Sequence, residues 1–259
     1  MRNIHKIIIA VFFVCVFVGA FLPFDLYNDM DMKNRSAGIS SLHWLGTDFL
    51  GRDVFYRMLR GAYNVALISL SSIVISLIIG GIPAILMASK KTNWRYVVNG
   101  TMDIMFVFPT ILIALVLVAI FGASIYVAII SISVFFIPVF YRVIYLSSRS
   151  VWQADFITSA RLSNVSMYKI ILNHILPNIR HIIIAQSSIQ FAVAIISESG
   201  LGYLGLSVES SQPTWGSMML DAQNSWFVDP YFIFPVGLTM GLTIYSFMKY
   251  GDGYKNDKN

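Results

Sequence analysis

The chain contains six long apolar stretches, each close to the length that a membrane-spanning helix needs. A helix rises about 1.5 Å per residue, so roughly 20 mostly apolar residues cross the hydrocarbon core of a bilayer. The stretches are Ile7–Leu22, Val65–Ser89, Met102–Phe121, Ile125–Leu146, Ile182–Leu201 and Phe232–Tyr250. Internal Ser, Gly and Pro are tolerated in such helices where neighbouring helices satisfy the freed backbone groups. The sequence therefore predicts an all-α integral membrane protein with about six transmembrane helices.

Composition supports the same class of protein. Hydrophobic residues make up 57% of the chain and charged residues 12%, with a mean hydropathy of +0.71. A soluble domain carries about 25% charged residues. The pI near 9.3 is explained by basic residues that flank membrane spans, so membrane lipid and no nucleic acid is the expected partner. Cys15 is the single cysteine, which excludes an intrachain disulfide.

The first apolar stretch resembles a secretory signal but lacks its cleavage site. Arg2 and Lys6 precede the apolar run, as they do in a signal peptide. No small-x-small site follows, and Phe21–Phe24 extends the apolar run instead. We expect an uncleaved anchor helix.

The distribution of Lys and Arg predicts the orientation. With the N-terminus inside, the inner segments carry thirteen basic residues and the outer segments carry five. Cytoplasmic loops are enriched in Lys and Arg. Both termini and the polar segment Trp152–Pro177, which lies between the fourth and fifth stretches, are therefore expected in the cytoplasm.

The polar segment is predicted to form two short helices. Asp155 suits the N-cap of the first, and Ser166 suits that of the second. Asn164 lies between them, and Asn tolerates a left-handed backbone. Pro177 is expected to end the second helix before the next span. An ordinary amphipathic loop on the membrane surface would show the same pattern.

The polar segment also resembles the "EAA" loop of permease subunits in bacterial ABC importers. That pattern is Glu-Ala-Ala, three residues, Gly, nine residues and I-x-L-P. Thr158–Ala160 occupies the triplet, Asn164 the Gly position, His174 the Ile position and Leu176–Pro177 the end. Thr158 and Asn164 depart from the pattern, while the spacing is intact.

Three further segments resemble the second permease of dipeptide, oligopeptide and nickel importers. His43–Ala62 is similar to its H-x-L-G-T-D-x-x-G-R-D signature, and Ser197–Asn224 to its E-x-S-L-S-F-L-G-L-G…P-x-W-G-x-M segment. Gly251–Asp257 is similar to its G-D-G-L-R-D ending. The expected organisation is an anchor helix with an outer amphipathic segment at 1–62 and a permease core at 63–259, with the EAA-like loop at 152–177.

The resemblance implies partners and a coupling role. It implies a second permease, two ATP-binding cassette ATPases and an extracytoplasmic solute-binding protein, with ATP and Mg²⁺ held by the ATPases. The residues it assigns to ATPase coupling are Asp155, Phe156, Ile157, Thr158, Ser159, Ala160, Arg161 and Asn164. Among these, Asp155 and Arg161 are expected to make polar contacts, and Phe156, Ile157 and Ala160 to pack.

The chain itself shows no enzymatic motif. It contains no G-x-x-x-x-G-K-[ST] phosphate loop, so ATP hydrolysis is expected from partner subunits. Gly200–Gly205 fits G-x-G-x-x-G but follows a membrane span rather than a strand, which favours a close turn or helix packing. The four scattered histidines predict no metal site, and no cofactor is expected in this chain.

Three other features are candidates for function or packing. Glu198 lies inside a predicted span near its outer end, and is either a gate residue of the pathway or a structural hydrogen-bond partner. Gly237 and Gly241 form G-x-x-x-G and suggest close helix approach. Arg52 and Arg57 suggest an outer amphipathic helix that either anchors in headgroups, which we favour, or receives a binding protein.

The sequence thus predicts a multi-pass subunit of the inner (cytoplasmic) membrane. Its expected function is the permease of an ATP-driven ABC importer for peptides, nickel or a metal chelate. The alternative is a self-sufficient secondary transporter or channel, for which buried charge relays or inverted repeats would be expected. A membrane-embedded enzyme is less favoured, because no catalytic constellation is present.

Overall fold

A computed structural model describes residues 3–89, 93–209, 211–224 and 230–256, and these residues form helices without a β-strand. The first helices are α1 (Ile4–Ala20), α2 (Phe24–Asn28), the 3₁₀ turn Met32–Asn34, α3 (Val54–Ser76), the π turn Leu77–Gly81 and α4 (Ile82–Ser89). Next come α5 (Asn93–Val107), α6 (Thr110–Phe121), α7 (Ile125–Trp152) and α8 (Asp155–Leu162). The last are α9 (Met167–Ile170), the π turn Ile171–Ile175, α10 (Leu176–Tyr203), α11 (Trp215–Asn224), the 3₁₀ turn Pro230–Phe232 and α12 (Ile233–Asn256). Arg2, Lys90, Lys91, Asp257 and Lys258, on which parts of the sequence prediction rest, lie outside the described residues.

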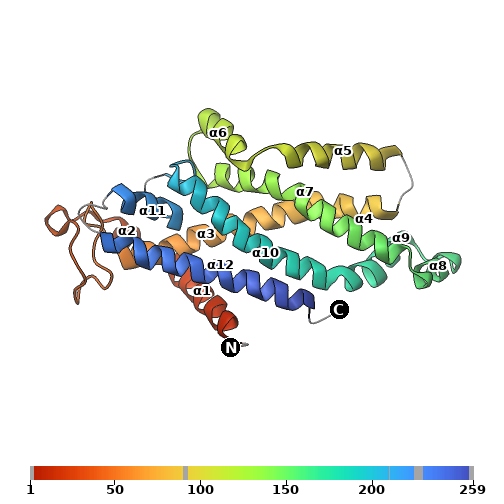
Figure 1. Cartoon of the computed structure of the whole chain (residues 1–259), viewed down its shortest axis with the longest axis horizontal. Helices are drawn as coiled ribbons and strands as arrows, with labels where there is room; N and C mark the ends of the chain where they lie inside the picture. Colours follow the sequence, from red (N-terminus) through yellow and green to blue (C-terminus); the bar gives the residue numbers. More distant parts are fainter. Residues whose placement is uncertain (1–2, 90–92, 210, 225–229, 257–259) are drawn as a thin grey trace.

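The long helices run side by side in one elongated bundle (Figure 1). Helix α10 packs against α12, and α7 packs against α3 and α4. Helices α5 and α6 lie along one side of α7. One end of the bundle carries α2 and α11, and the opposite end carries α8 and α9 (Figure 1). We call these the α2 end and the α8 end.

Among the described residues, three helical stretches are long and apolar enough to cross a membrane, and the number rises to five if each of two bent pairs is one span. The three are residues 54–89, 125–152 and 167–203. Helices α5 and α6 form one of the bent pairs, with an angle of 81° at the break before Pro109. The expected span Met102–Phe121 is therefore not one continuous helix: Pro109 ends α5, because the residue before a proline is pushed out of helical geometry. Helix α12 forms where the sixth span was expected, but length and composition do not mark it as a candidate span among the described residues.

Two prolines are accommodated by π turns rather than by helix ends. The π turn Leu77–Gly81 ends two residues before Pro83, and the π turn Ile171–Ile175 ends two residues before Pro177. Proline lacks an N–H and clashes with the carbonyl four residues earlier, and a wider turn relieves both problems. Helical structure therefore continues through both sites.

Small residues set the distance between packed helices. The Ser72 and Ser76 hydroxyls donate to the carbonyls of Ile129 (3.1 Å) and Ser133 (2.9 Å) and join α3 to α7. A side chain on Gly80 would overlap the carbonyl of Ile137. The expected close approach at Gly237 and Gly241 is wrong for this chain alone, since a Cβ at either position meets nothing within 4 Å.

An aromatic cluster fixes the anchor helix to the core. Phe12 of α1 packs edge-on against Phe191, Trp215 and Phe247, with ring centroids 5.8–5.9 Å apart. These three rings come from α10, α11 and α12. Edge-to-face aromatic pairs contribute about 0.5–1.5 kcal/mol each beyond the burial of their area. Helix α1 is therefore part of the bundle.

Candidate functional site

The polar segment Trp152–Pro177 forms the α8 end of the bundle. Helix α8 begins at Asp155, and its N-cap is Ala154. The prediction of Asp155 as the N-cap is therefore off by one residue. Asp155 lies in the first turn and Arg161 in the last, where their charges complement the helix dipole.

A Schellman motif ends α8 at the position where the family pattern has Gly. Asn164 is left-handed, with φ of 59°, as its place between the two helices predicted. Its N–H donates to the carbonyl of Arg161 (3.1 Å), and the N–H of Val165 donates to that of Ala160 (3.2 Å). This pair of bonds is the Schellman arrangement, which requires a left-handed residue. Asn164 can replace Gly because Asn adopts that backbone more readily than other residues with a side chain.

The second helix of the segment does not end at Pro177. Ser166 is the N-cap of α9, as predicted, although its side chain makes no cap hydrogen bond. Helix α9 then passes through the π turn into α10, so helical structure is continuous over residues 167–203. The Asn178 side-chain amide donates to the carbonyl of His174 at 2.6 Å, on the turn that Pro177 disturbs. The expected break is wrong, because the π turn absorbs the proline.

The predicted coupling residues differ in how exposed their side chains are. Ile157 is completely buried within the chain, so it anchors α8 to the bundle. Phe156 is 48% exposed and lies with its ring centroid 6.1 Å from that of His174. The exposed side chains of the segment include those of Asp155, Phe156, Thr158, Ser159, Arg161, Leu162, Asn164 and Tyr168. Arg161 also lines a small groove between the end of α4 and the polar segment.

Glu198 is completely buried where α10 meets the loop before α11. Its Oε1 accepts a hydrogen bond from the Ser207 hydroxyl at 2.8 Å. A Cβ on Gly202, one helical turn after Glu198, would lie 2.9 Å from the Ser217 nitrogen. Helices α10 and α11 are therefore in close contact next to Glu198. Gly205 has φ of +72° and forms the turn that brings Ser207 back to Glu198. The G-x-G-x-x-G run therefore serves helix packing and a turn.

The sequence did not predict a buried ion cluster at the α2 end. Arg52 Nε donates to Asp48 Oδ2 at 2.7 Å, and Arg57 Nε lies 3.5 Å from the same oxygen. Both guanidinium groups also reach Asp221 Oδ2, at 3.1 and 3.2 Å. We call Asp48, Arg52, Arg57 and Asp221 the α2-end ion cluster. It joins the segment before α3 to α11.

The α2-end ion cluster corrects the expected headgroup anchor. Arg52 is 3% exposed and Arg57 is 1% exposed, so neither side chain can contact lipid. Burial raises the pKa of Asp221, and the charges of Arg57 and Arg52 oppose this effect. The Asp48–Arg52 spacing was visible in the sequence. Asp221 is 169 residues from Arg52, so no local spacing could reveal that contact.

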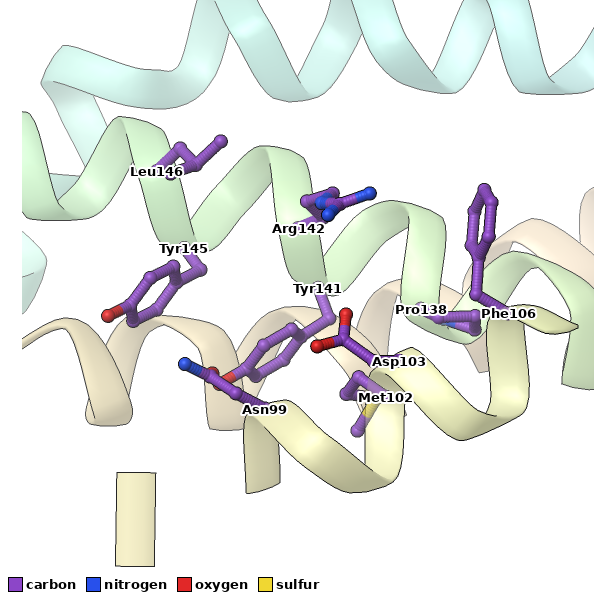
Figure 2. Close-up of a pocket in the computed structure, with 9 residues that line it drawn as sticks. All are labelled: Asn99, Met102, Asp103, Phe106, Pro138, Tyr141, Arg142, Tyr145 and Leu146. Atoms are coloured by element: carbon purple, nitrogen blue, oxygen red, sulfur yellow. The ribbon is translucent and has the colours of Figure 1, made fainter. Parts of the chain in front are cut away.

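A second polar feature is a cavity of about 370 Å³ between α5 and α7. Figure 2 shows its nine lining side chains: Asn99, Met102, Asp103, Phe106, Pro138, Tyr141, Arg142, Tyr145 and Leu146. The Tyr141 hydroxyl donates to Asn99 Oδ1 at 2.6 Å and ties the two helices together. The rings of Tyr141 and Tyr145 are stacked, with centroids 5.7 Å apart and 9° between their planes. The sequence did not predict this cavity.

Comparison with known proteins places this architecture in a family. Residues 72–249 match the family described as "Binding-protein-dependent transport system inner membrane component". The chain belongs to this family. It is accordingly an inner membrane component of a transport system. The matched region contains the polar segment, Glu198, Asp221 and both walls of the cavity.

Similar curated proteins are permeases over nearly the whole chain. A dipeptide transport system permease protein, DppC, of Alkalihalophilus pseudofirmus is 32% identical over 251 residues, which cover 96% of this chain and 82% of the relative. A glutathione transport system permease protein, GsiD, of Escherichia coli is 33% identical over 250 residues, with the same two coverages of 96% and 82%. A solved structure of the MetNI methionine ABC transporter in an inward-facing conformation matches with a TM-score of 0.63. It covers 76% of this chain and 94% of that chain at 14% identity, and shows the shared fold.

Proposed function

We propose that this chain is a permease subunit of an ATP-driven ABC importer for peptides. The observation that carries the proposal is the similarity to dipeptide and glutathione permeases over 96% of the chain. The sequence resemblance also extends to importers of nickel and metal chelates. Peptides are the preferred cargo, because the names of the similar permeases refer to dipeptides and glutathione.

The proposed assembly contains a second permease, two ATP-binding cassette ATPases and an extracytoplasmic binding protein. The α8 end faces the cytoplasm, as do both termini, and the α2 end faces outward. The excess of Lys and Arg in the segments assigned to the inside supports this orientation. About six spans cross the membrane, with α12 as the last and the bent pair α5–α6 counted as one.

The polar segment is the proposed contact with an ATPase. Its exposed side chains lie beyond the bundle on a short helix that is anchored by Ile157 and closed by Asn164. Rigid-body transmission needs an element of defined shape. Movement of an ATPase would therefore displace α8 and, through the continuous helix 167–203, shift the region around Glu198. Glu198 would hold the loop before α11 in place and so keep the outer end of the pathway closed.

A reconstitution experiment tests the proposal. The chain is purified with its partners in mild detergent, identified by mass spectrometry and placed in liposomes with an equimolar pool of free-ended di- and tripeptides. We expect ATP-dependent import of peptides, and no competition by Ni²⁺. Import by the chain alone, driven by an ion gradient, would instead establish the alternative of a secondary transporter. ATP-dependent import of Ni²⁺ without peptides would overturn the proposed cargo.

A further inference from the structure

The cavity between α5 and α7 has the composition of a ligand site. One wall carries Asn99, Met102, Asp103 and Phe106, which recur at helical spacing on α5. The other wall carries Pro138, Tyr141, Arg142, Tyr145 and Leu146, which recur in the same way on α7. Its volume of about 370 Å³ lies within the range of roughly 300–1,000 Å³ that small-molecule sites occupy.

Its two charges lie at the same depth. Asp103 is ten residues from the start of α5, and Arg142 is ten residues from the end of α7. Both of these helix ends lie at the α8 end (Figure 1). At about 1.5 Å per residue, each charge is about 15 Å from its helix end, and both lie inside the predicted spans Met102–Phe121 and Ile125–Leu146, toward the end of each span nearer the α8 end.

The two charges do not neutralise each other. Within the described residues no ion pair joins Asp103 to Arg142 or to another side chain, and both side chains are exposed in this chain. An ionisable side chain inside a membrane span is costly, and such residues face a water-filled path or a partner group. An uncompensated carboxylate and guanidinium on one cavity therefore indicate a ligand that carries both complementary charges.

We infer that this cavity binds short zwitterionic peptides in transit, an inference that rests on the proposed function. Asp103 would accept hydrogen bonds from the peptide α-ammonium, and Arg142 would donate to its carboxylate. Asn99 accepts from Tyr141 through Oδ1, so its Nδ2 is available to a peptide carbonyl. Met102, Phe106 and Leu146 provide apolar surface for peptide side chains. Recognition of the charged ends and the backbone makes the site tolerant of peptide sequence.

Asp103→Asn and Arg142→Gln test the transport role, since each removes the charge and keeps a polar side chain, and Asn has the same shape as Asp. In the reconstituted importer we expect each to lower peptide import at least tenfold and to raise the ATP hydrolysed per imported peptide. Arg95→Gln is the matched control, because Arg95 lies on α5 outside the cavity. Import equal to that of the wild type in both cavity variants would overturn the inference and leave the proposed function intact.

A protection assay tests binding directly. Leu146→Cys is made in a Cys15→Ser background and labelled with a thiol reagent in the assembled importer. The probe is the set of peptides that the wild type imports from the pool. We expect these peptides to slow labelling at 146 at least threefold, and Asp103→Asn to abolish this protection. Thr101→Cys, which is exposed on α5 outside the cavity, serves as the unprotected control.

Three outcomes would overturn the inference. Peptides that are imported without protecting the thiol at 146 would exclude the cavity as a binding site. A thiol at 146 that never reacts in the assembled importer would show that another subunit fills the cavity. A wild type that imports no peptide would overturn the proposed function and the inference with it.

Discussion

At the scale of single residues, removal of a member of the α2-end ion cluster is expected to lower the stability of the chain most. Arg57 is 1% exposed and shares two carboxylates with Arg52. Removal of one partner from a buried ion pair costs about 3–5 kcal/mol, because the remaining charge stays buried. We expect Arg57→Met to lower the stability of the purified chain by about 3 kcal/mol, measured by denaturant unfolding in detergent.

The control for this prediction is Arg35→Met. Arg35 is exposed, and its Nε donates to the carbonyl of Phe49 at 2.7 Å. Loss of such a bond costs about 1 kcal/mol.

The double variant Arg57→Met/Asp221→Leu should lose less stability than the sum of the losses in its two single variants, since the effects of residues in one network are not additive. Strict additivity would contradict a cluster that acts as a unit.

Asn164 gives a second prediction at this scale. Its left-handed backbone costs an ordinary residue about 1–2 kcal/mol and costs Gly almost nothing. We expect Asn164→Gly to stabilise α8 by a few tenths of a kcal/mol and Asn164→Ala to destabilise it by about 1 kcal/mol. Hydrogen exchange at the Val165 amide measures this, because that amide bonds to Ala160 across the motif. Ser163→Ala is the control, and equal exchange in all three variants would contradict the assignment.

At the scale of helices, contact between α10 and α11 depends on the absence of side chains. A Cβ on Gly216 would lie 2.5 Å from the Ser199 carbonyl oxygen, so Gly216→Ala must separate the two helices. We expect a loss of about 2 kcal/mol in the purified chain. Gly237→Ala is the matched control, since its Cβ meets nothing within 4 Å and Ala is favoured by about 1 kcal/mol within a helix. Equal losses in the two variants would refute this view of the contact.

The helices also show what can be predicted from sequence. Apolar length located the helices, because burial of every backbone group in a membrane permits little else. It did not locate the bends. Pro109 breaks a helix, while Pro83 and Pro177 are absorbed by π turns, and the three prolines look alike in sequence. The difference is decided by the neighbours that pack around each turn.

For the whole molecule, contacts within the polar segment could be predicted and contacts between distant segments could not. The left-handed Asn164 follows from the local pattern of two helices joined by a short turn. The pairing of Arg52 with Asp221 and that of Asn99 with Tyr141 join segments that are far apart in the chain. Such pairs depend on how helices pack, which periodicity within one helix does not contain. The same limit hid the cavity between α5 and α7.

The whole molecule has one continuous element that links its two ends. Residues 167–203 run from the polar segment to the Glu198 region through the π turn Ile171–Ile175. This helix is 37 residues long, or about 55 Å at 1.5 Å per residue, which exceeds the thickness of a bilayer core. A displacement of the α8 end is therefore transmitted along it only if the π turn remains stiff.

Two glycines in the π turn should prevent a displacement of the α8 end from reaching the Glu198 region. Each Gly costs about 1 kcal/mol relative to Ala within a helix and adds backbone freedom. In the reconstituted importer we expect Asn173→Gly/His174→Gly to lower peptide import at least fivefold and to raise the ATP consumed per imported peptide. Asn173→Ala/His174→Ala removes the same side chains but keeps the helix, so it should retain more than half of the import. If the alanine pair lost import as fully as the glycine pair, the side chains would matter and stiffness would not.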